Sequence, residues 1–155
     1  MVQIKISHTY DRIAKEYHAL RTKTYLHGFF FNELLEMPTT LKLLGNVRGK
    51  TILDIGCGTG IYAGLLKKKG AIITGIDISS GMIAIAQREN PTIEFKIGTA
   101  EKLPYESESF DIVLSALAIE YLADWNGVFQ EVRRVLKRNG IFVFSTGNPV
   151  VNSRK

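Results

Sequence analysis

The sequence has a single cysteine, Cys57, and no long apolar run. One cysteine excludes a disulfide within the chain and, without neighbouring ligands, a structural zinc site. A membrane-spanning helix requires roughly 20 apolar residues, and the first residues, Met1 to Lys5, lack the apolar core of a signal peptide. We therefore expect a cytoplasmic chain with no metal ion and no membrane span.

A large excess of charge of one sign is also missing. Twenty Lys and Arg against fifteen Asp and Glu leave a net charge of +5, which is too small to indicate nucleic-acid binding. The basic clusters at 67–69 and 133–138 fall at the ends of predicted helices, where the helix dipole favours cations. The 155 residues, 45% of them hydrophobic, suit one domain with one core.

Strands and helices alternate from residue 50 onward. Helices are predicted over 60–69, after Ser79, and from Asp124 to the pair Asn139-Gly140. This alternation predicts an α/β fold, a three-layer αβα sandwich whose mainly parallel sheet has the order 3-2-1-4-5. The five predicted strands are 51–55, 71–76, 92–97, 110–115 and 141–146.

Helical patterns precede the first strand. Apolar residues recur at helical spacing over 7–20, with Ser7 as an available cap, and again over 24–37, where Pro38 is expected to end the helix. A short helix over 41–44 follows. Aromatic residues in this part either line a pocket or belong to the core.

A glycine-rich segment joins the first strand to the next helix. Asp54 lies in the strand, and Gly56, Gly58 and Gly60 follow with Cys57 between the first two. Glycine allows a sharp turn and close approach of a ligand to the backbone, and we expect the N–H groups of the turn to point at that ligand. An ordinary βα turn that is rich in glycine is the alternative.

An acidic residue ends the second strand. Asp77 stands where a βαβ unit places a carboxylate that binds both hydroxyls of a ribose. Helix capping is the other common role of Asp, but Ser79 and Ser80 are better placed for it. The glycine turn and Asp77 together predict a nucleoside-binding site.

The glycine spacing indicates which nucleoside. Dinucleotide-binding turns have G-x-G-x-x-G, and Ile61 occupies the position of the third glycine. Residues 53–60, LDIGCGTG, instead resemble the first motif of class I S-adenosylmethionine-dependent methyltransferases. Asp54 would repel a pyrophosphate but suits a cofactor that carries an ammonium and a sulfonium.

The resemblance covers nearly the whole chain. Residues 10–17 resemble the Y-D-x-x-A-x-x-Y lead-in of small-molecule methyltransferases, 98–113 the G-D-A-E-x-L-P-F…F-D block of the methyltransferase-11 group, and 136–140 its L-K-P-G-G turn. It implies a Rossmann-like fold with N-terminal helices over the site, and S-adenosylmethionine as a cofactor that becomes S-adenosylhomocysteine. The implied binding residues are Tyr10 and Tyr17 for the methionine carboxylate, Asp54, Gly56, Cys57, Gly58 and Gly60 for the methionine part, Asp77 for the ribose, Ile78, Met82, Ala100 and Glu101 for the adenine, and Ser115 and Leu117 beneath the sulfonium.

Two positions depart from the family pattern. Thr99 replaces an Asp that contacts the adenine amino group, and Glu120 with Tyr121 replaces a pair of His at the reaction centre. Glu120 is the catalytic candidate, either as a base or as a partner of a cationic acceptor, with solvated surface as the alternative. His18 and His27 are the other candidates for a base.

The fifth predicted strand, 141–146, is apolar and uncharged, which is typical of an interior strand. Family members continue beyond it into a helix and an antiparallel strand pair, whereas this chain stops at 155. We therefore expect a homo-oligomer or strand exchange through this strand, or a piece of a longer protein.

The expected organisation is one S-adenosylmethionine-binding methyltransferase domain over 1–155, with a helical cap (1–48), a Rossmann-like core (49–147) and a tail (148–155). The expected function is in-line transfer of a methyl group to a small-molecule acceptor, which the sequence does not identify. A non-catalytic cofactor-binding module, or a fragment of a longer methyltransferase, is the alternative. A nicotinamide oxidoreductase is a third option that Ile61 disfavours.

Overall fold

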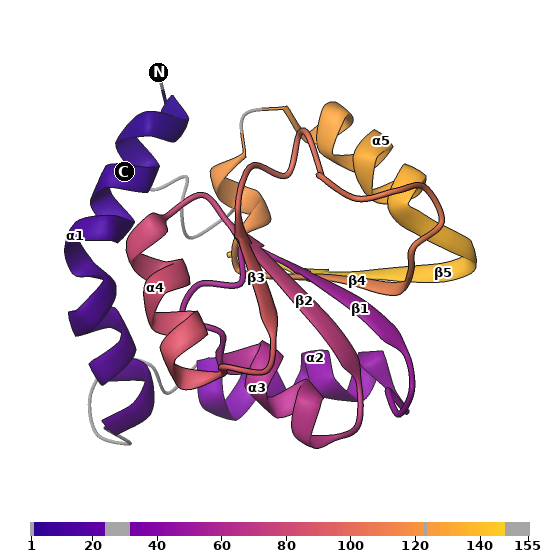
Figure 1. The fold of residues 1–155 in the computed structure, drawn as a ribbon, viewed down its shortest axis with the longest axis horizontal. Helices are drawn as coiled ribbons and strands as arrows, with labels where there is room; N and C mark the ends of the chain where they lie inside the picture. The colour runs from indigo at the N-terminus through magenta and orange to yellow at the C-terminus, as the bar shows by residue number, and fades with distance from the viewer. Residues whose placement is uncertain (1, 24–31, 123, 148–155) are drawn as a thin grey trace.

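The fold is built on one five-stranded sheet (Figure 1). The computed structural model describes residues 2–23, 32–122 and 124–147. All strand pairs are parallel, and the order is β3-β2-β1-β4-β5, which confirms the predicted fold class. The strands are β1 (Thr51–Ile55), β2 (Ile72–Asp77), β3 (Glu94–Ile97), β4 (Phe110–Ala116) and β5 (Leu136–Ser145).

Helices cover both faces of the sheet (Figure 1). One face packs against α2 (Met37–Leu44), α3 (Ile61–Lys68) and α4 (Ser80–Glu89), and the other against α5 (Trp125–Val135). Helix α1 (Val2–Lys23) lies outside α4, where Ala14 packs on Met82 and Ile85.

The alternation of side chains along β1 explains why both faces are covered. Ile52 belongs to the core cluster that contains Leu66 of α3, whereas Leu53 belongs to the cluster that contains Val132 of α5. Both β1 residues are fully buried. Successive strand residues point to opposite faces, so an apolar run such as 51–55 needs a helical layer on each side.

The N-terminal helices differ from the prediction. Ser7 lies inside α1 and does not cap it; its hydroxyl donates to the Ile78 carbonyl at 3.2 Å. The predicted helix over 24–37 falls mostly outside the described residues. Its last part, Asn32–Glu36, is a π-helical turn, η1. Pro38 lies in the first turn of α2, where a missing N–H costs nothing, so the prediction that it ends a helix is wrong.

The junction of α5 and β5 is also different. Asp124 caps α5 as predicted, by accepting from the Gly127 N–H, but the helix ends at Val135 and not at Asn139-Gly140. Leu136 already pairs with Phe110, and the register then shifts, so that residues 137–140 bulge out of β5. Asn139 adopts a φ of 68° within this bulge. Asn tolerates that conformation, so the pair that indicated a helix end marks a bulge.

Strands β3 and β5 form the two edges of the sheet. On β5, Ile141 and Phe144 are 44% and 41% exposed. The Phe142 and Phe144 rings stack at 5.1 Å, and Phe129 of α5 packs beside both. No helix in the described ranges combines the length and apolar character needed to cross a bilayer.

Candidate functional site

The glycine turn after β1 is held against the end of β2. The Gly56 and Cys57 N–H groups both donate to the Ile76 carbonyl, at 2.8 and 3.1 Å, and the Gly60 N–H donates to the Cys57 carbonyl at 3.0 Å. The Gly58 N–H donates to Asp77 Oδ2 at 2.9 Å. The expectation that these N–H groups point at a ligand is therefore wrong for all four. A turn whose donors are used in this way offers little to a phosphate.

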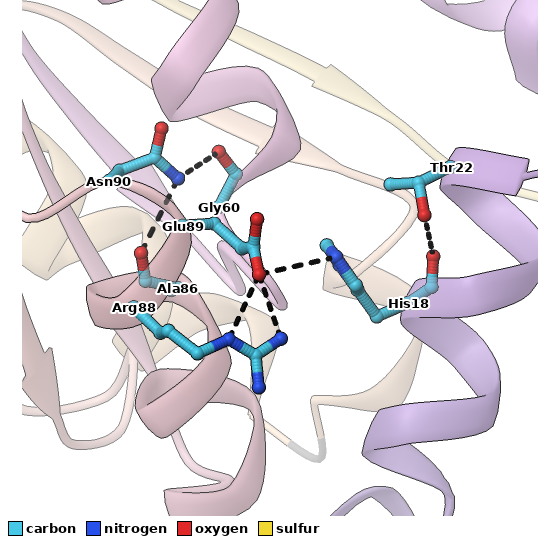
Figure 2. Close-up of polar contacts among 7 residues, drawn as sticks. All are labelled: His18, Thr22, Gly60, Ala86, Arg88, Glu89 and Asn90. Atoms are coloured by element: carbon cyan, nitrogen blue, oxygen red, sulfur yellow. Dashed lines mark hydrogen bonds and ion pairs between the residues drawn. The ribbon is translucent and has the colours of Figure 1, made fainter.

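Gly56 is required where the turn meets the end of β4. Its φ is 69°, and a Cβ there would lie 2.3 Å from the Ala118 side chain. Only glycine fits both the conformation and the space. Gly60, by contrast, faces the core beside Phe95, and its carbonyl accepts from Asn90 at 3.2 Å (Figure 2). Gly60 lines neither of the two cavities described below.

Asp77 closes β2 and faces the turn. Oδ2 accepts from the Gly58 N–H and Oδ1 from the Ser79 N–H, both at 2.9 Å. Burial raises the pKa of Asp77, and the backbone donors oppose that shift. Ser79 caps α4 by accepting from the Met82 N–H. The prediction that a serine, and not Asp77, caps this helix is therefore confirmed. Each Asp77 oxygen keeps a lone pair for a further donor.

A first cavity opens between the glycine turn, the end of β2, the β3–β4 loop and α1. Tyr10 of α1 contacts Tyr17 and Tyr121 edge to face, with ring centroids 6.4 and 5.9 Å apart. Ten of the predicted binding residues line this cavity: Tyr10, Tyr17, Gly56, Gly58, Asp77, Ile78, Met82, Ala100, Glu101 and Leu117. Thr99, Ile6, Gly98 and Tyr121 line it as well.

A second cavity lies on the other side of the turn. It shares Tyr17, Gly56, Gly58, Ala116 and Leu117 with the first cavity, so the two adjoin. Asp54, Cys57 and Thr59 line it from β1 and the turn. Other elements contribute four more residues that the sequence analysis did not name as binding residues: Arg21, Glu36, Ile61 and Tyr62.

Asp54 is a deeply buried acid of the site. It is 2% exposed, and its Oδ2 has no hydrogen-bond partner among the described residues. Burial, and then the charges of Asp77 and Glu36, raise its pKa to about 7. Burial also raises the pKa of the Cys57 thiol, with Asp54 and Asp77 contributing. This shift disfavours the thiolate, which is the reactive form of a cysteine.

The remaining candidates lie elsewhere. Ser115 is buried at the end of β4 without lining either cavity, and its hydroxyl has no partner among the described residues. Glu120 lies in the 3₁₀ turn η2 (Ile119–Tyr121) and accepts from the Thr146 hydroxyl at 3.1 Å and from the Gly147 N–H. This places its carboxylate at the end of β5, outside both cavities.

Of the two histidine candidates, the structure describes only His18. His18 Nε2 lies 3.8 Å from Glu89 Oε1, where α1 meets the end of α4 (Figure 2), and His18 lines neither cavity. His27 falls outside the described residues. Among the described residues, no group of three or more His, Cys, Asp and Glu is arranged to hold a metal ion.

A contact that the sequence did not reveal fixes α1 over the site. Asp11 Oδ1 accepts from the Ser79 hydroxyl at 2.7 Å, the Gly81 N–H at 2.8 Å and the Ser80 hydroxyl at 3.3 Å. The Gly81 N–H, followed by the two hydroxyls, holds the pKa of Asp11 below its usual range. One carboxylate of α1 thus binds the first turn of α4, and Tyr10 and Tyr17 are positioned by the same helix.

We expect Asp11→Ala to lower the free energy of unfolding by about 1–2 kcal/mol, because a helix N-terminus loses a charged acceptor. Urea unfolding would measure the loss, and amide exchange of α1 should accelerate in the same variant. Glu16→Gln, an exposed position on the same helix, is the control. Unchanged exchange of α1 in Asp11→Ala would contradict the expectation.

The family profile described as "Methyltransferase domain" matches residues 53–144. A demethylmenaquinone methyltransferase of Thermotoga maritima is 36% identical over 136 residues, which cover 86% of this chain and 58% of that protein. The chain spans 56–62% of the length of the curated relatives that align with most of it.

Solved structures agree with this match. An S-adenosylmethionine-dependent methyltransferase from Mesorhizobium loti has a TM-score of 0.71 and 35% identity, with 74% of this chain and 55% of that chain covered. The [4+2]-cyclase SpnF has a TM-score of 0.78 and 27% identity, with 94% and 60% covered. The match to the family profile, the sheet order and the cavities beside the glycine turn lead to one conclusion: the chain belongs to the class I S-adenosylmethionine-dependent methyltransferases.

Proposed function

We propose that this chain binds S-adenosylmethionine across the two adjoining cavities and transfers its methyl group to a small-molecule acceptor. The observation that carries the proposal is the polarity of the glycine turn. Its N–H groups are used within the protein, whereas Asp54 and Asp77 face the cavities with carboxylates. Such a site suits a cationic nucleoside and not a pyrophosphate, which also weighs against a nicotinamide cofactor.

The residues fit the parts of the cofactor in order. Asp77 has lone pairs for the ribose hydroxyls, and Ile78, Met82, Ala100 and Glu101 offer a largely apolar wall for the adenine. Gly56, Cys57 and Gly58 border the methionine part, with Asp54 toward its ammonium and Tyr17 toward its carboxylate. Leu117, which lines both cavities, lies where the sulfonium would cross between them, with Ser115 two residues before it.

The bound cofactor supplies a methyl group on a sulfonium, which is itself a good leaving group. The chain has to orient that group toward the acceptor and exclude water, and orientation alone can lower a barrier by about 7–11 kcal/mol. Tyr10 and Tyr17 of α1 line the first cavity, where they would help with both tasks. Glu120 remains a proposal as the base, although its carboxylate holds the end of β5.

The acceptor class follows from a relative. The Thermotoga maritima protein is named a demethylmenaquinone methyltransferase, so a demethylated quinone precursor is the first acceptor to test. Purified chain would be mixed with S-adenosylmethionine carrying a labelled methyl group and such precursors, and label should move to one of them. Calorimetry with S-adenosylhomocysteine would run in parallel. If neither binding nor transfer occurs, the proposal is wrong.

A cofactor-binding module without transfer is the second candidate. The chain spans 56–62% of the length of those relatives, and a protein of similar fold is named a cyclase. Tight binding of S-adenosylhomocysteine without any labelled product across the acceptor panel would favour this candidate. Fluorescence energy transfer to NADH bound by the chain would instead support the third hypothesis, a nicotinamide oxidoreductase.

We also propose a cytoplasmic location and a self-association through β5. The strand is an edge with exposed Ile141 and Phe144, and an apolar edge pairs readily with another strand. We expect the chain to sediment as a dimer or larger species and Ile141→Lys to shift it at least partly to monomer. Thr92→Lys, an exposed position before the opposite edge strand, is the control. A monodisperse wild-type monomer would contradict the expectation.

A further inference from the structure

Glu36 is a buried carboxylate that the glycine motif does not include. It ends the π-helical turn η1 and is 8% exposed. Its Oε2 accepts from the Tyr62 hydroxyl at 2.8 Å, and its Oε1 accepts from the hydroxyls of Thr40 at 2.9 Å and Ser145 at 2.6 Å. These donors come from α3, α2 and β5, so four elements fix the carboxylate. Three hydroxyl donors on one carboxyl group suit its ionised, acceptor-only form.

Glu36 lines the second cavity together with Asp54. Arg21 is the one cationic side chain among the described residues that line this cavity, and its Nη1 donates to the Tyr17 hydroxyl at 3.1 Å. Two oxygens around the cavity, Asp54 Oδ2 and Thr59 Oγ1, are buried without a partner among the described residues. Both residues are 2% exposed.

Buried carboxylates and unpartnered oxygens are costly unless something pairs with them. The second cavity therefore has the charge and the acceptors for a ligand group that is cationic and donates several hydrogen bonds. A primary ammonium has three N–H donors and a positive charge, which is the chemistry that this set of oxygens lacks. π-Helical turns are frequent at functional sites, which agrees with the position of Glu36.

We propose that Glu36 binds, with Asp54, the ammonium at the methionine end of the cofactor. The inference rests on the proposed function, because Asp77 in the first cavity would set the ribose and thereby direct the methionine end past Gly56 and Gly58 into the second cavity. Glu36 Oε2, which has one donor in place, keeps a lone pair for the ammonium. Glu36 is thus a cofactor-binding residue that comes from the segment before β1.

A purely structural role is the competing account, since the three hydroxyls by themselves satisfy much of the carboxylate. The two accounts differ in one respect. A structural residue affects all ligands alike, whereas a partner of the ammonium affects only ligands that carry it. The test is therefore a comparison of two ligands: S-adenosylhomocysteine and its analogue in which hydrogen replaces the amino group.

Calorimetry would measure both ligands on wild type and on Glu36→Gln. On wild type we expect the analogue to bind 10- to 100-fold more weakly, as for the loss of hydrogen bonds between charged groups. In Glu36→Gln we expect S-adenosylhomocysteine to lose about tenfold and the analogue less than threefold, so that the two affinities converge. Glu16→Gln, which removes an exposed carboxylate of α1, should keep the wild-type ratio of the two affinities, that for S-adenosylhomocysteine over that for the analogue.

Two further variants distinguish the charge of Glu36 from its structural role. Thr40→Val removes one donor to Glu36 and keeps the carboxylate, so its ratio should stay near that of wild type. Glu36→Asp retracts the charge by one methylene and should give a lower ratio, and it remains informative if Glu36→Gln does not fold. A ratio of unity on wild type, or an unchanged ratio in Glu36→Gln, would overturn the inference alone. Failure of wild type to bind S-adenosylhomocysteine would overturn the proposed function as well.

Discussion

Replacing Asp54 by asparagine is expected to stabilise the fold at pH 8 by up to about 4 kcal/mol and to remove most of its affinity for the cofactor. The pKa of Asp54 rises from 3.8 to about 7, because burial and then the charges of Asp77 and Glu36 disfavour its ionised form. Between these two pH values the folded chain keeps a proton that the unfolded chain has released. Stability therefore falls as the pH rises from about 4 to about 7.

The amide of the Asp54→Asn variant cannot ionise, so this fall should be absent from it. Urea unfolding of both proteins at intervals from pH 4 to pH 8 would show curves that meet near pH 4 and separate toward pH 8. Asp111 provides a control of opposite sign. The Thr51 N–H and hydroxyl, with Lys137, lower its pKa to about 2. Asp111→Asn should lose stability above pH 4, and the loss should shrink toward pH 2. Parallel curves for wild type and Asp54→Asn would contradict the prediction.

The same acid links cofactor binding to pH. A cation placed beside Asp54 favours its ionised form, so binding near pH 7 should release part of a proton. Calorimetry in two buffers of different ionisation enthalpy would measure the release on wild type, and Asp54→Asn should abolish it. If both predictions hold, Asp54 destabilises the fold and serves binding, which is a common trade between stability and function.

The features that the sequence predicted depend on neighbours in the chain. β1 has its predicted bounds because four strand-forming residues, with Asp54 among them, meet a glycine turn, and the Ser79 and Asp124 caps follow from their own helices. The strand order follows from right-handed crossovers between such units. Local signals fail where two of them conflict: Asn139-Gly140 suits a helix end and a bulge equally well, and the pairing of Leu136 with Phe110 decides for the bulge.

The features that the sequence did not predict depend on side chains distant in the chain. Glu36 meets Ser145 across 109 positions, and Asp11 meets Gly81 across 70. No periodicity marks such contacts, because each depends on how whole elements pack. The glycine turn shows a third case. Its residue types were recognised, but the N–H groups of Gly56, Cys57 and Gly58 donate to β2, since the turn lies against that strand and not against open solvent.

Asp77→Ala is expected to weaken the binding of S-adenosylhomocysteine by about 10²–10⁴-fold. Two hydrogen bonds from ribose hydroxyls to a carboxylate would be lost, and each contributes about 1.5–3 kcal/mol when one partner is charged. Asp77 also accepts from the Gly58 and Ser79 N–H groups, so the glycine turn loses one of its ties to β2. Calorimetry would measure the affinity, and circular dichroism would show that the variant is folded.

An analogue that lacks both ribose hydroxyls separates the two effects. If Asp77 acts only on the hydroxyls, wild type and Asp77→Ala should bind this analogue equally weakly. Any further loss of affinity for the analogue in the variant measures the effect of the hydrogen bond from the Gly58 N–H to Asp77, which positions the turn for the methionine end. Glu94→Gln, an exposed carboxylate on neighbouring β3, is the charge control and should bind both ligands as wild type does. If a folded Asp77→Ala variant binds S-adenosylhomocysteine within threefold of the wild-type affinity, the ribose is not bound at Asp77. The nucleoside would then have to be bound by residues other than the acid that ends β2.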